Sequence, residues 1–167
     1  MVQHLLVPTD GSAQSQRCVS HAVELARALG ARITVFHARE SPYAHTAVPP
    51  YGLEVAAFDP DLTERFQAGR REHAERLLAQ ARAMTADAGV TVATESVEAD
   101  CVWKAILEAA SRHGCDLIMM ASHGRSGLAA LLVGSETLRV LSHSPIPVLV
   151  DRPGQAEAHG REDEMPV

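Results

Sequence analysis

Lysine is almost absent from this chain, and its scarcity excludes one large class of nucleotide-binding proteins. The only lysine is Lys104, which lies inside a helix-like segment. An ordinary P-loop ATPase needs a lysine directly before a serine or threonine, so this chain is not one. Long apolar runs are missing too: no segment approaches ~20 consecutive apolar residues, and the start of the chain lacks the charged region of a signal peptide. We therefore predict no membrane span and no secretion.

Cysteines and clustered positive charges are also few. The chain has 3 cysteines without C-x-x-C spacing, which indicates buried or free thiols of a reducing compartment and not a disulfide framework. The net charge is −6 over 167 residues, and no cluster of cations suggests a nucleic-acid surface. We expect a cytoplasmic protein with one main domain and no nucleic-acid partner.

Histidines are numerous but scattered. The 9 histidines show neither H-x-x-x-H nor H-x-H spacing. We interpret them as surface or capping residues and not as a metal site. A Ser–His–Asp triad can be drawn from Ser122, His123 and Asp10, but the chain has no G-x-S-x-G elbow to support hydrolase chemistry.

Apolar strand-like runs alternate with helix-like segments along the chain. The predicted strands are residues 4–8, 33–36, 90–92, 116–120 and 146–150, and between them lie four predicted helices. Gly30 is expected to end the first helix, and Asp100 to cap the third. Near-continuous apolar strands separated by helices indicate an α/β fold with a parallel sheet covered on both faces. The fold class is a doubly wound, three-layer α/β/α sandwich with an open five-stranded sheet.

Two segments fall outside this regular pattern. A proline-rich connection covers about residues 39–62, and its length is typical of a functional flap or of a disordered surface loop. The polar, charged segment 152–167 is expected to be disordered. The domain itself therefore covers residues 1–151.

Small polar residues follow two of the predicted strands. The first strand is followed by Thr9-Asp10-Gly11-Ser12, and the fourth by Ala121-Ser122-His123-Gly124-Arg125-Ser126-Gly127, with Gly134-Ser135 further on. A strand that leads through a small-residue loop to a helix N-terminus directs several backbone N–H groups to one point, which favours an anion such as phosphate. In open α/β sheets, ligands bind at such strand ends.

These motifs resemble the universal stress protein family over residues 1 to about 151. The resemblance rests on the opening Leu5–Ser12, on the strand and loop from Asp116 to Gly127, and on the ending from Gly134 to Val150. It implies the strand order 3-2-1-4-5 and the binding of ATP, or of ADP or AMP, in a regulatory protein of the stress response. It also implies dimers that pair their fifth strands antiparallel, with an unknown protein partner downstream.

The resemblance also implies a set of nucleotide-binding residues. They are Pro8, Thr9, Asp10, Ala38, Met120, Ala121, His123, Gly124, Arg125, Gly134, Ser135, Glu136 and Thr137. Gly124, Gly134 and Ser135 would surround the phosphates, and the end of the second strand, His37-Ala38, would meet adenine through backbone groups. Asp10 would contact a ribose hydroxyl or a Mg²⁺ ion that bridges to the phosphates. Arg125 would either pair with phosphate oxygens or remain a solvated loop arginine.

One position departs from the family's signature of glycine, two residues, glycine, nine residues, glycine, then serine or threonine. Gly124, Gly134 and Ser135 match it, but Ala121 occupies the place of the first glycine. A left-handed backbone at Ala121 would cost ~1–2 kcal/mol. A strand end is normally extended, so we expect alanine to be tolerated there.

Three functional hypotheses remain open. The leading one is a nucleotide-binding regulatory module. The alternatives are a slow ATP-hydrolysing enzyme that uses the same pocket, and a stress protein that binds no nucleotide and acts through protein contacts. For the homodimer we expect the fifth strand to form the interface through Ile146, Val148, Leu149 and Val150, since an uncovered apolar edge invites pairing. Pro147 would limit the ladder on one side.

Overall fold

The computed structural model describes residues 1–41, 60–122 and 133–152, and the side chains of residues 60–63 are left undescribed. Its elements are β1 (His4–Pro8), α1 (Ala13–Leu29), β2 (Arg32–Glu40), α3 (Pro60–Thr85), β3 (Val92–Ala99), α4 (Val102–Arg112), β4 (Leu117–Ala121), α5 (Ser135–His143) and β5 (Val148–Asp151). Most of the predicted proline-rich connection and nearly all of segment 152–167 lie outside the described residues, so both remain expectations.

The described strands form one parallel sheet of 5 strands in the order β3-β2-β1-β4-β5. This confirms the predicted fold class and strand order. The central strands are buried on both faces: Leu5, Leu6 and Val7 of β1 have exposed fractions of 0%. Such strands read as continuous apolar runs, which is why the sequence predicted them well.

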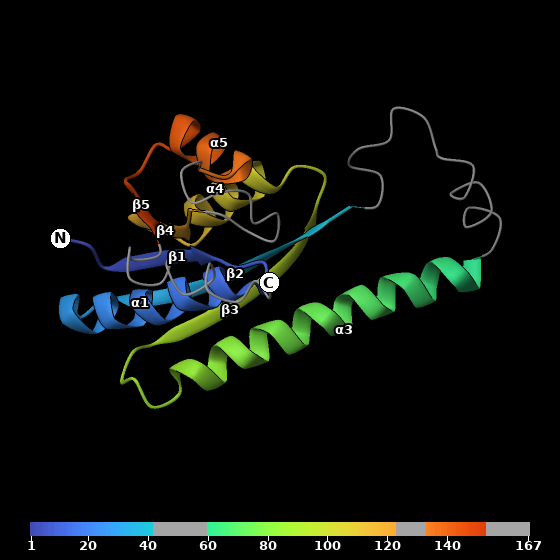
Figure 1. The fold of residues 1–167 in the computed structure, drawn as a ribbon, viewed down its shortest axis with the longest axis horizontal. Coiled ribbons are helices and arrows are strands. Elements are labelled where there is room, and N and C mark those ends of the chain that lie inside the picture. The colour runs from blue at the N-terminus through green and yellow to red at the C-terminus, as the bar shows by residue number, and fades with distance from the viewer. Residues whose placement is uncertain (42–59, 123–132, 153–167) are drawn as a thin grey trace, which may run out of the picture.

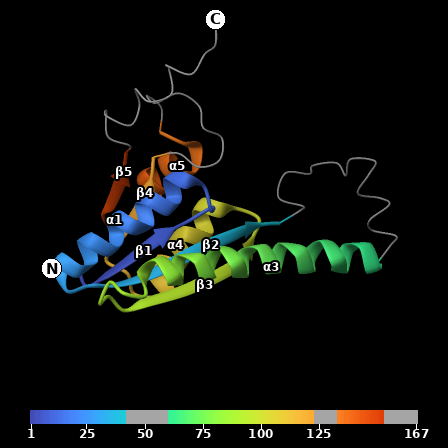
Figure 2. The same cartoon turned by 60° about the horizontal axis from the view of Figure 1, so that its bottom comes forward.

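Helices cover both faces of the sheet (Figure 1). On one face, α1 and α3 pack over a core that includes Cys18, Leu78 and Val35. On the other face, α4 and α5 pack over a second core that includes Ile106, Val140 and Phe36. The result is a three-layer sandwich with an apolar core on each side of the sheet. Figure 2 shows that the amino-terminal part of α3 extends past the ends of the strands.

Both ends of α1 are fixed by residues suited to the position. Ser12 is the N-cap, and its hydroxyl accepts a hydrogen bond from the Ser15 N–H at 3.2 Å. Gly30 follows the last turn with a φ of +65°, in the left-handed region that glycine adopts without strain. The prediction that Gly30 ends this helix is confirmed.

Several boundaries differ from the sequence prediction: β2, predicted over residues 33–36, runs from Arg32 to Glu40, and β5, predicted over residues 146–150, runs from Val148 to Asp151. β3 runs from Val92 to Ala99 and not over residues 90–92, because this edge strand carries the polar residues Thr94, Glu95 and Ser96, which hide its extended pattern. The cap of α4 is Cys101 and not Asp100, and it makes no side-chain capping hydrogen bond.

Other local expectations concerned the cysteines and the membrane. All three thiols, at Cys18, Cys101 and Cys115, are free, as the sequence indicated. Within the described part of the chain, no helix has the length and apolar character needed to cross a membrane.

Candidate functional site

The carboxyl ends of β1 and β4 lie next to each other in the sheet. Leu5 pairs with Leu117 and Leu6 with Ile118, so the two strands end side by side (Figure 1). The order in which strands are added to the sheet reverses at β1: β2 lies on one side of it and β4 on the other. This topological switch point is where open α/β sheets bind ligands.

Thr9 organises the turn that follows β1. Its N–H donates to the Phe36 carbonyl at 2.8 Å, and its hydroxyl lies 3.0 Å from that of Ser15 in α1. The Gly11 N–H donates to the same Thr9 hydroxyl oxygen at 3.3 Å. With an exposed fraction of 7%, the Thr9 side chain supports the turn from inside.

Asp10 stands at the amino-terminal end of α1. Its Oδ1 accepts a hydrogen bond from the Ser12 N–H at 3.0 Å, which closes a turn of the Asx type. The positive end of the helix dipole lies at the same point and stabilises the carboxylate. The turn therefore presents a fixed negative charge at the end of β1.

Glycine is the residue type that fits at position 11, next to Asp10. Its φ is +80°, and a Cβ built on it would lie only 2.7 Å from Leu77 Cδ1 of α3. The turn after β1 thus depends on close contact with α3 as well as on a left-handed backbone.

His37 in β2 is a functional candidate whose side chain the sequence analysis overlooked. It has an exposed fraction of 6%, and its Nδ1 lies 2.7 Å from the Thr9 carbonyl oxygen. A carbonyl only accepts, so Nδ1 carries the proton and the ring ties β2 to the turn after β1. The next residue, Ala38, packs against the core on the α4 side of the sheet. The sequence shows a histidine near the end of this strand, but the alternation of side chains along a strand does not by itself tell on which face of the sheet the ring lies.

The end of β4 places Met120 and Ala121 on opposite faces. Met120 belongs to the core beneath α4, and Ala121 to the core beneath α1 and α3. Ala121 is the last residue of the strand and is therefore extended. The expectation that residue 121 is extended is confirmed, while the tolerance of alanine beside a ligand stays a prediction.

The start of α5 is held against the end of β4. Gly134 is the N-cap, and its N–H donates to the carbonyl of Ser122 at 2.7 Å, while the Ser122 N–H donates to the Asp151 carbonyl of β5 at 2.8 Å. The first turn then presents the N–H groups of Ser135, Glu136 and Thr137, which have no backbone acceptor within the described residues. The N–H groups of a helix start and the positive end of the dipole make this point attractive to an anion.

The side chains of two predicted site residues in this turn, Glu136 and Thr137, form hydrogen bonds with other parts of the protein. The Glu136 carboxylate accepts a hydrogen bond from the Trp103 N–H at 2.8 Å and pairs with Arg139 at 3.1 Å. It satisfies the start of α4, where the cap itself supplies no side-chain bond. The Thr137 hydroxyl donates to the Ala121 carbonyl at 3.0 Å. Because both side chains are engaged in these bonds, the backbone N–H is the group left at each position as a possible ligand contact.

Three further predicted residues cannot be placed. His123, Gly124 and Arg125 lie outside the described residues. Their proposed contacts with phosphate stay predictions. At the carboxyl end of the sheet, the structure thus brings together the turn after β1, the end of β2, the end of β4 and the first turn of α5.

Asp10 is also the predicted contact for a Mg²⁺ ion. Within residues 1–41, 60–122 and 133–152, no group of three or more histidine, cysteine or acidic side chains could hold a metal ion. Mg²⁺ commonly binds through one or two carboxylates together with substrate phosphates. A single carboxylate such as Asp10 fits that arrangement.

The fifth strand forms one edge of the sheet. Leu149 has an exposed fraction of 42%, whereas Ile146, Val148 and Val150 are half-buried. On the neighbouring helix α5, Leu138 and Leu141 are exposed as well. Leu149 is therefore the exposed member of the predicted interface set, whereas Ile146, which precedes β5, and Val148 pack against the core beneath α4 and α5.

Comparison with known proteins gives one consistent answer. The model of the Universal stress protein family matches residues 1–152. A protein of Thermus aquaticus named "Universal stress protein in QAH/OAS sulfhydrylase 3'region" is 34% identical over 152 residues, which is 91% of this chain and 100% of that protein. The solved structure of universal stress protein UspA from Lactobacillus plantarum is 27% identical, with a TM-score of 0.74 over 90% of this chain and 98% of that one.

A second solved structure has the same fold at lower identity. It is a universal stress protein in complex with cAMP, 24% identical, with a TM-score of 0.60 over 90% of this chain and 97% of that one.

Proposed function

Because the chain belongs to the universal stress protein family, we propose that it is a regulatory protein of the stress response that binds an adenine nucleotide. The nucleotide, which is ATP, ADP or AMP, occupies the crevice at the carboxyl ends of β1 and β4. The observation that carries the proposal is the first turn of α5, whose N–H groups at Ser135, Glu136 and Thr137 stand beside the end of β4. The complex of one family member with cAMP is consistent with this ligand class.

The phosphates and the base take opposite ends of the crevice in this proposal. The phosphates meet the start of α5, where Gly134 allows close approach and Ser135 offers its hydroxyl and its N–H. Gly124 and Arg125 complete the phosphate contacts. The adenine lies toward Ala38, and the side chain of His37 holds the adjacent turn in place.

Asp10 acts on a part of the nucleotide that tolerates a negative charge. Direct contact with phosphate would bring two anions together, so the carboxylate serves a ribose hydroxyl or a Mg²⁺ ion carried by the phosphates. Because its Oδ1 already accepts the Ser12 N–H, Asp10 is better suited to binding than to activating water. Binding is therefore proposed ahead of the alternative of slow ATP hydrolysis.

The proposal includes a homodimer that forms through β5 and a cytoplasmic location. The exposed edge of β5 supports the first. The free thiols of Cys18, Cys101 and Cys115 suit a reducing compartment such as the cytoplasm.

The test begins with the purified full chain. Denaturing the protein and separating the released small molecules identifies any bound adenine nucleotide, and calorimetric titration with ATP, ADP and AMP, with and without Mg²⁺, measures affinity. Released ATP without turnover supports the binding protein, whereas ADP or AMP with measurable turnover supports the enzyme. Neither bound nucleotide nor affinity would leave the protein-contact alternative.

A charge-reversal variant tests the site itself. Ser135→Asp places a carboxylate in the first turn of α5, where the helix dipole tolerates it but a phosphate does not. We expect at least about a tenfold loss of affinity, which corresponds to about 1.4 kcal/mol. Ser20→Asp adds the same charge to the exposed side of α1 and should bind nucleotide like the wild type. Equal affinity in Ser135→Asp and Ser20→Asp would exclude the start of α5 as the phosphate site.

A further inference from the structure

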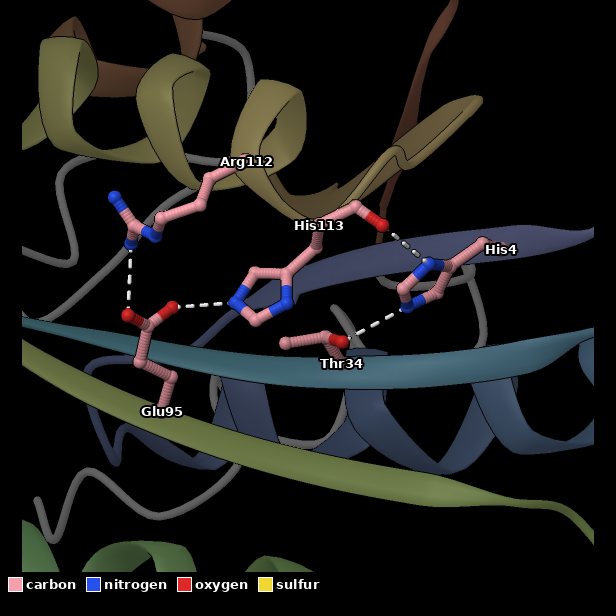
Figure 3. A network of polar contacts seen from close by, with 5 residues as sticks. All are labelled: His4, Thr34, Glu95, Arg112 and His113. Atoms are coloured by element: carbon pink, nitrogen blue, oxygen red, sulfur yellow. Dashed lines mark hydrogen bonds and ion pairs between the residues drawn. The ribbon is translucent and has the colours of Figure 1, made fainter.

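A cluster of polar side chains lies at the other end of the sheet from the proposed nucleotide site. It joins His4 of β1, Thr34 of β2, Glu95 of β3 and the end of α4 at Arg112 and His113 (Figure 3). We name this set the His4 cluster. It takes no part in the proposed nucleotide binding, and the sequence analysis, which interpreted histidines as surface or capping residues, was wrong for His4, whose exposed fraction is 5%.

Hydrogen bonds determine the protonation state of His4. Its Nδ1 lies 3.2 Å from the carbonyl oxygen of His113, and its Nε2 lies 2.8 Å from the hydroxyl of Thr34. The carbonyl only accepts, so Nδ1 carries the proton of the neutral ring. Nε2 is then the acceptor, and Thr34, which is 1% exposed, donates its hydroxyl hydrogen to it.

A second proton on His4 would disrupt this arrangement. Nε2–H would face the Thr34 hydroxyl hydrogen, which would have to turn toward another acceptor in a buried site. Burial lowers the pKa of His4 below its usual 6.5, and Arg32 and His113 lower it further. The carbonyl of His113 and the carboxylate of Asp116 oppose this shift, but the pKa remains lowered.

The neighbouring imidazole of His113 has the opposite environment. Its Nε2 lies 2.6 Å from Glu95 Oε2, and Arg112 pairs with the other carboxylate oxygen at 2.7 Å. Figure 3 shows His113 between Glu95 and His4, and the two ring centroids are 6.4 Å apart. The His113 ring thus contacts a carboxylate directly, whereas the His4 ring contacts a carbonyl and a hydroxyl.

Hydrogen bonds of the Gln3 and His4 backbone also join the starts of β1, β2 and β4. The Gln3 and His4 N–H groups donate to the Asp116 carboxylate just before β4, at 2.8 and 3.1 Å, and the Asp116 N–H donates to the His4 carbonyl at 3.0 Å. The Arg32 N–H of β2 donates to the Gln3 carbonyl at 3.0 Å. The charged and titratable groups around His4 and its contacts are Arg32, Glu95, Arg112, His113, Cys115, Asp116 and the amino group of Met1.

We propose that the His4 cluster is a proton-sensitive clasp, which holds the amino ends of β1, β2 and β4 together while His4 is neutral and releases them when His4 takes up a proton. The protein then senses acidification at a place separate from its nucleotide site. The direction follows from linkage. Below pH 6.5 the unfolded chain binds a proton at residue 4 that the folded chain refuses, so stability falls as the pH falls.

The size of the effect has an upper limit. If His4 stays neutral in the folded state, its contribution raises the unfolding equilibrium constant up to about tenfold between pH 7.5 and pH 5.5. Asp116 adds a separate loss at lower pH, because its pKa lies below the usual 3.8 and its stabilisation disappears only when it is protonated.

Urea unfolding of the full chain at pH 7.5 and 5.5 tests the clasp. His4→Gln removes the titrating ring and should lose up to about tenfold of the pH dependence. His73→Gln, at an exposed position of α3, should keep the dependence of the wild type. Equal pH dependence in His4→Gln and the wild type would overturn the proposal.

Two measurements on the wild type need no variant. Imidazole NMR should find His4 in the Nδ1–H form and titrating below pH 6.5, and titration at or above that pH would refute the clasp. In hydrogen exchange at pH 5.5 relative to pH 7.5, corrected for intrinsic rates, the Arg32 and Asp116 amides should lose more protection than the Ser122 amide at the opposite end of the sheet. An equal loss at both ends would reject local release.

Discussion

The hydroxyl of Thr137 in α5 donates a hydrogen bond at 3.0 Å to the carbonyl oxygen of Ala121, the last residue of β4. Both residues are buried, with exposed fractions of 4% and 9%. Together with the bond from the Gly134 N–H to the Ser122 carbonyl, this contact fixes the first turn of α5 against the strand end. The position of the proposed phosphate site therefore depends on a side chain that does not face the phosphate.

Thr137→Val tests this dependence, because valine keeps the shape of threonine and removes the hydroxyl. We expect the free energy of unfolding, measured in urea, to fall by about 1–3 kcal/mol, since the buried Ala121 carbonyl loses a donor. Ser142→Ala removes an exposed hydroxyl from the same helix and should change stability by less than about 0.5 kcal/mol. Similar losses in both variants would mean that the contact between α5 and β4 adds nothing specific.

Gly11→Ala probes the turn that carries Asp10. The variant meets two penalties: a left-handed backbone, which costs about 1–2 kcal/mol, and overlap with Leu77, which adds about 1–3 kcal/mol. Gly30→Ala is the matched control, because its φ is +65° but no atom lies within 4 Å of the added carbon. Thermal and urea unfolding should therefore rank Gly11→Ala as the more damaging. Equal losses would show that α3 yields to the methyl group without cost.

The fold was predictable where one physical signal dominated. Apolar runs such as 4–8 and 116–120 are long enough to identify buried parallel strands, and Gly30 marks a helix end by its backbone freedom. The predicted third strand is shorter than β3 because this half-buried edge strand carries polar residues such as Glu95, which contribute nothing to an apolar pattern. The strand order itself came from the family resemblance and not from the pattern.

The sequence indicates which strand ends the candidate site would use but not how the side chains there are engaged. Strand ends followed by small residues point to the carboxyl ends of β1 and β4, whereas the side-chain roles depend on contacts between distant segments. Glu136 reaches the start of α4, 33 residues away in sequence, and His37 reaches Thr9, 28 residues away. Neither contact leaves a local signature, because it arises only when the sheet brings those segments together.

Cys101 is less buried than Cys18 and Cys115, and this difference predicts which thiol a reagent modifies first. Burial raises the pKa of Cys18 to about 12 and that of Cys115 to about 11, with nearby Asp151 and Asp116 adding to the respective shifts. A thiol reagent at pH 8 should therefore modify the partly exposed Cys101 first, and Cys101→Ser should abolish this fast phase. Rapid modification that persists in Cys101→Ser would contradict the burial of the other two.

The raised pKa of Cys18 also makes the free energy of unfolding depend on pH at alkaline pH. Above the usual thiol pKa of 9.0 the unfolded chain loses protons that the folded chain keeps at Cys18. Stability is therefore fully present below pH 9 and declines as the pH rises toward 12. Cys18→Ala should show a shallower decline than the wild type in urea unfolding between pH 8.5 and 10.5. A decline that is unchanged in Cys18→Ala would assign it to other groups.

The edge of β5 yields the prediction that bears on assembly. Leu149 lies on this open edge with an exposed fraction of 42%, and a second copy could pair with the strand and cover the leucine. We expect the wild type to be a dimer at micromolar concentration by size exclusion with light scattering. Leu149→Glu should give monomers, because the interface would then bury an unpaired carboxylate. Leu29→Glu, at a leucine of similar exposure (37%) in α1, should remain dimeric. A monomeric wild type would rule out the dimer, and a dimeric Leu149→Glu would move the interface away from β5.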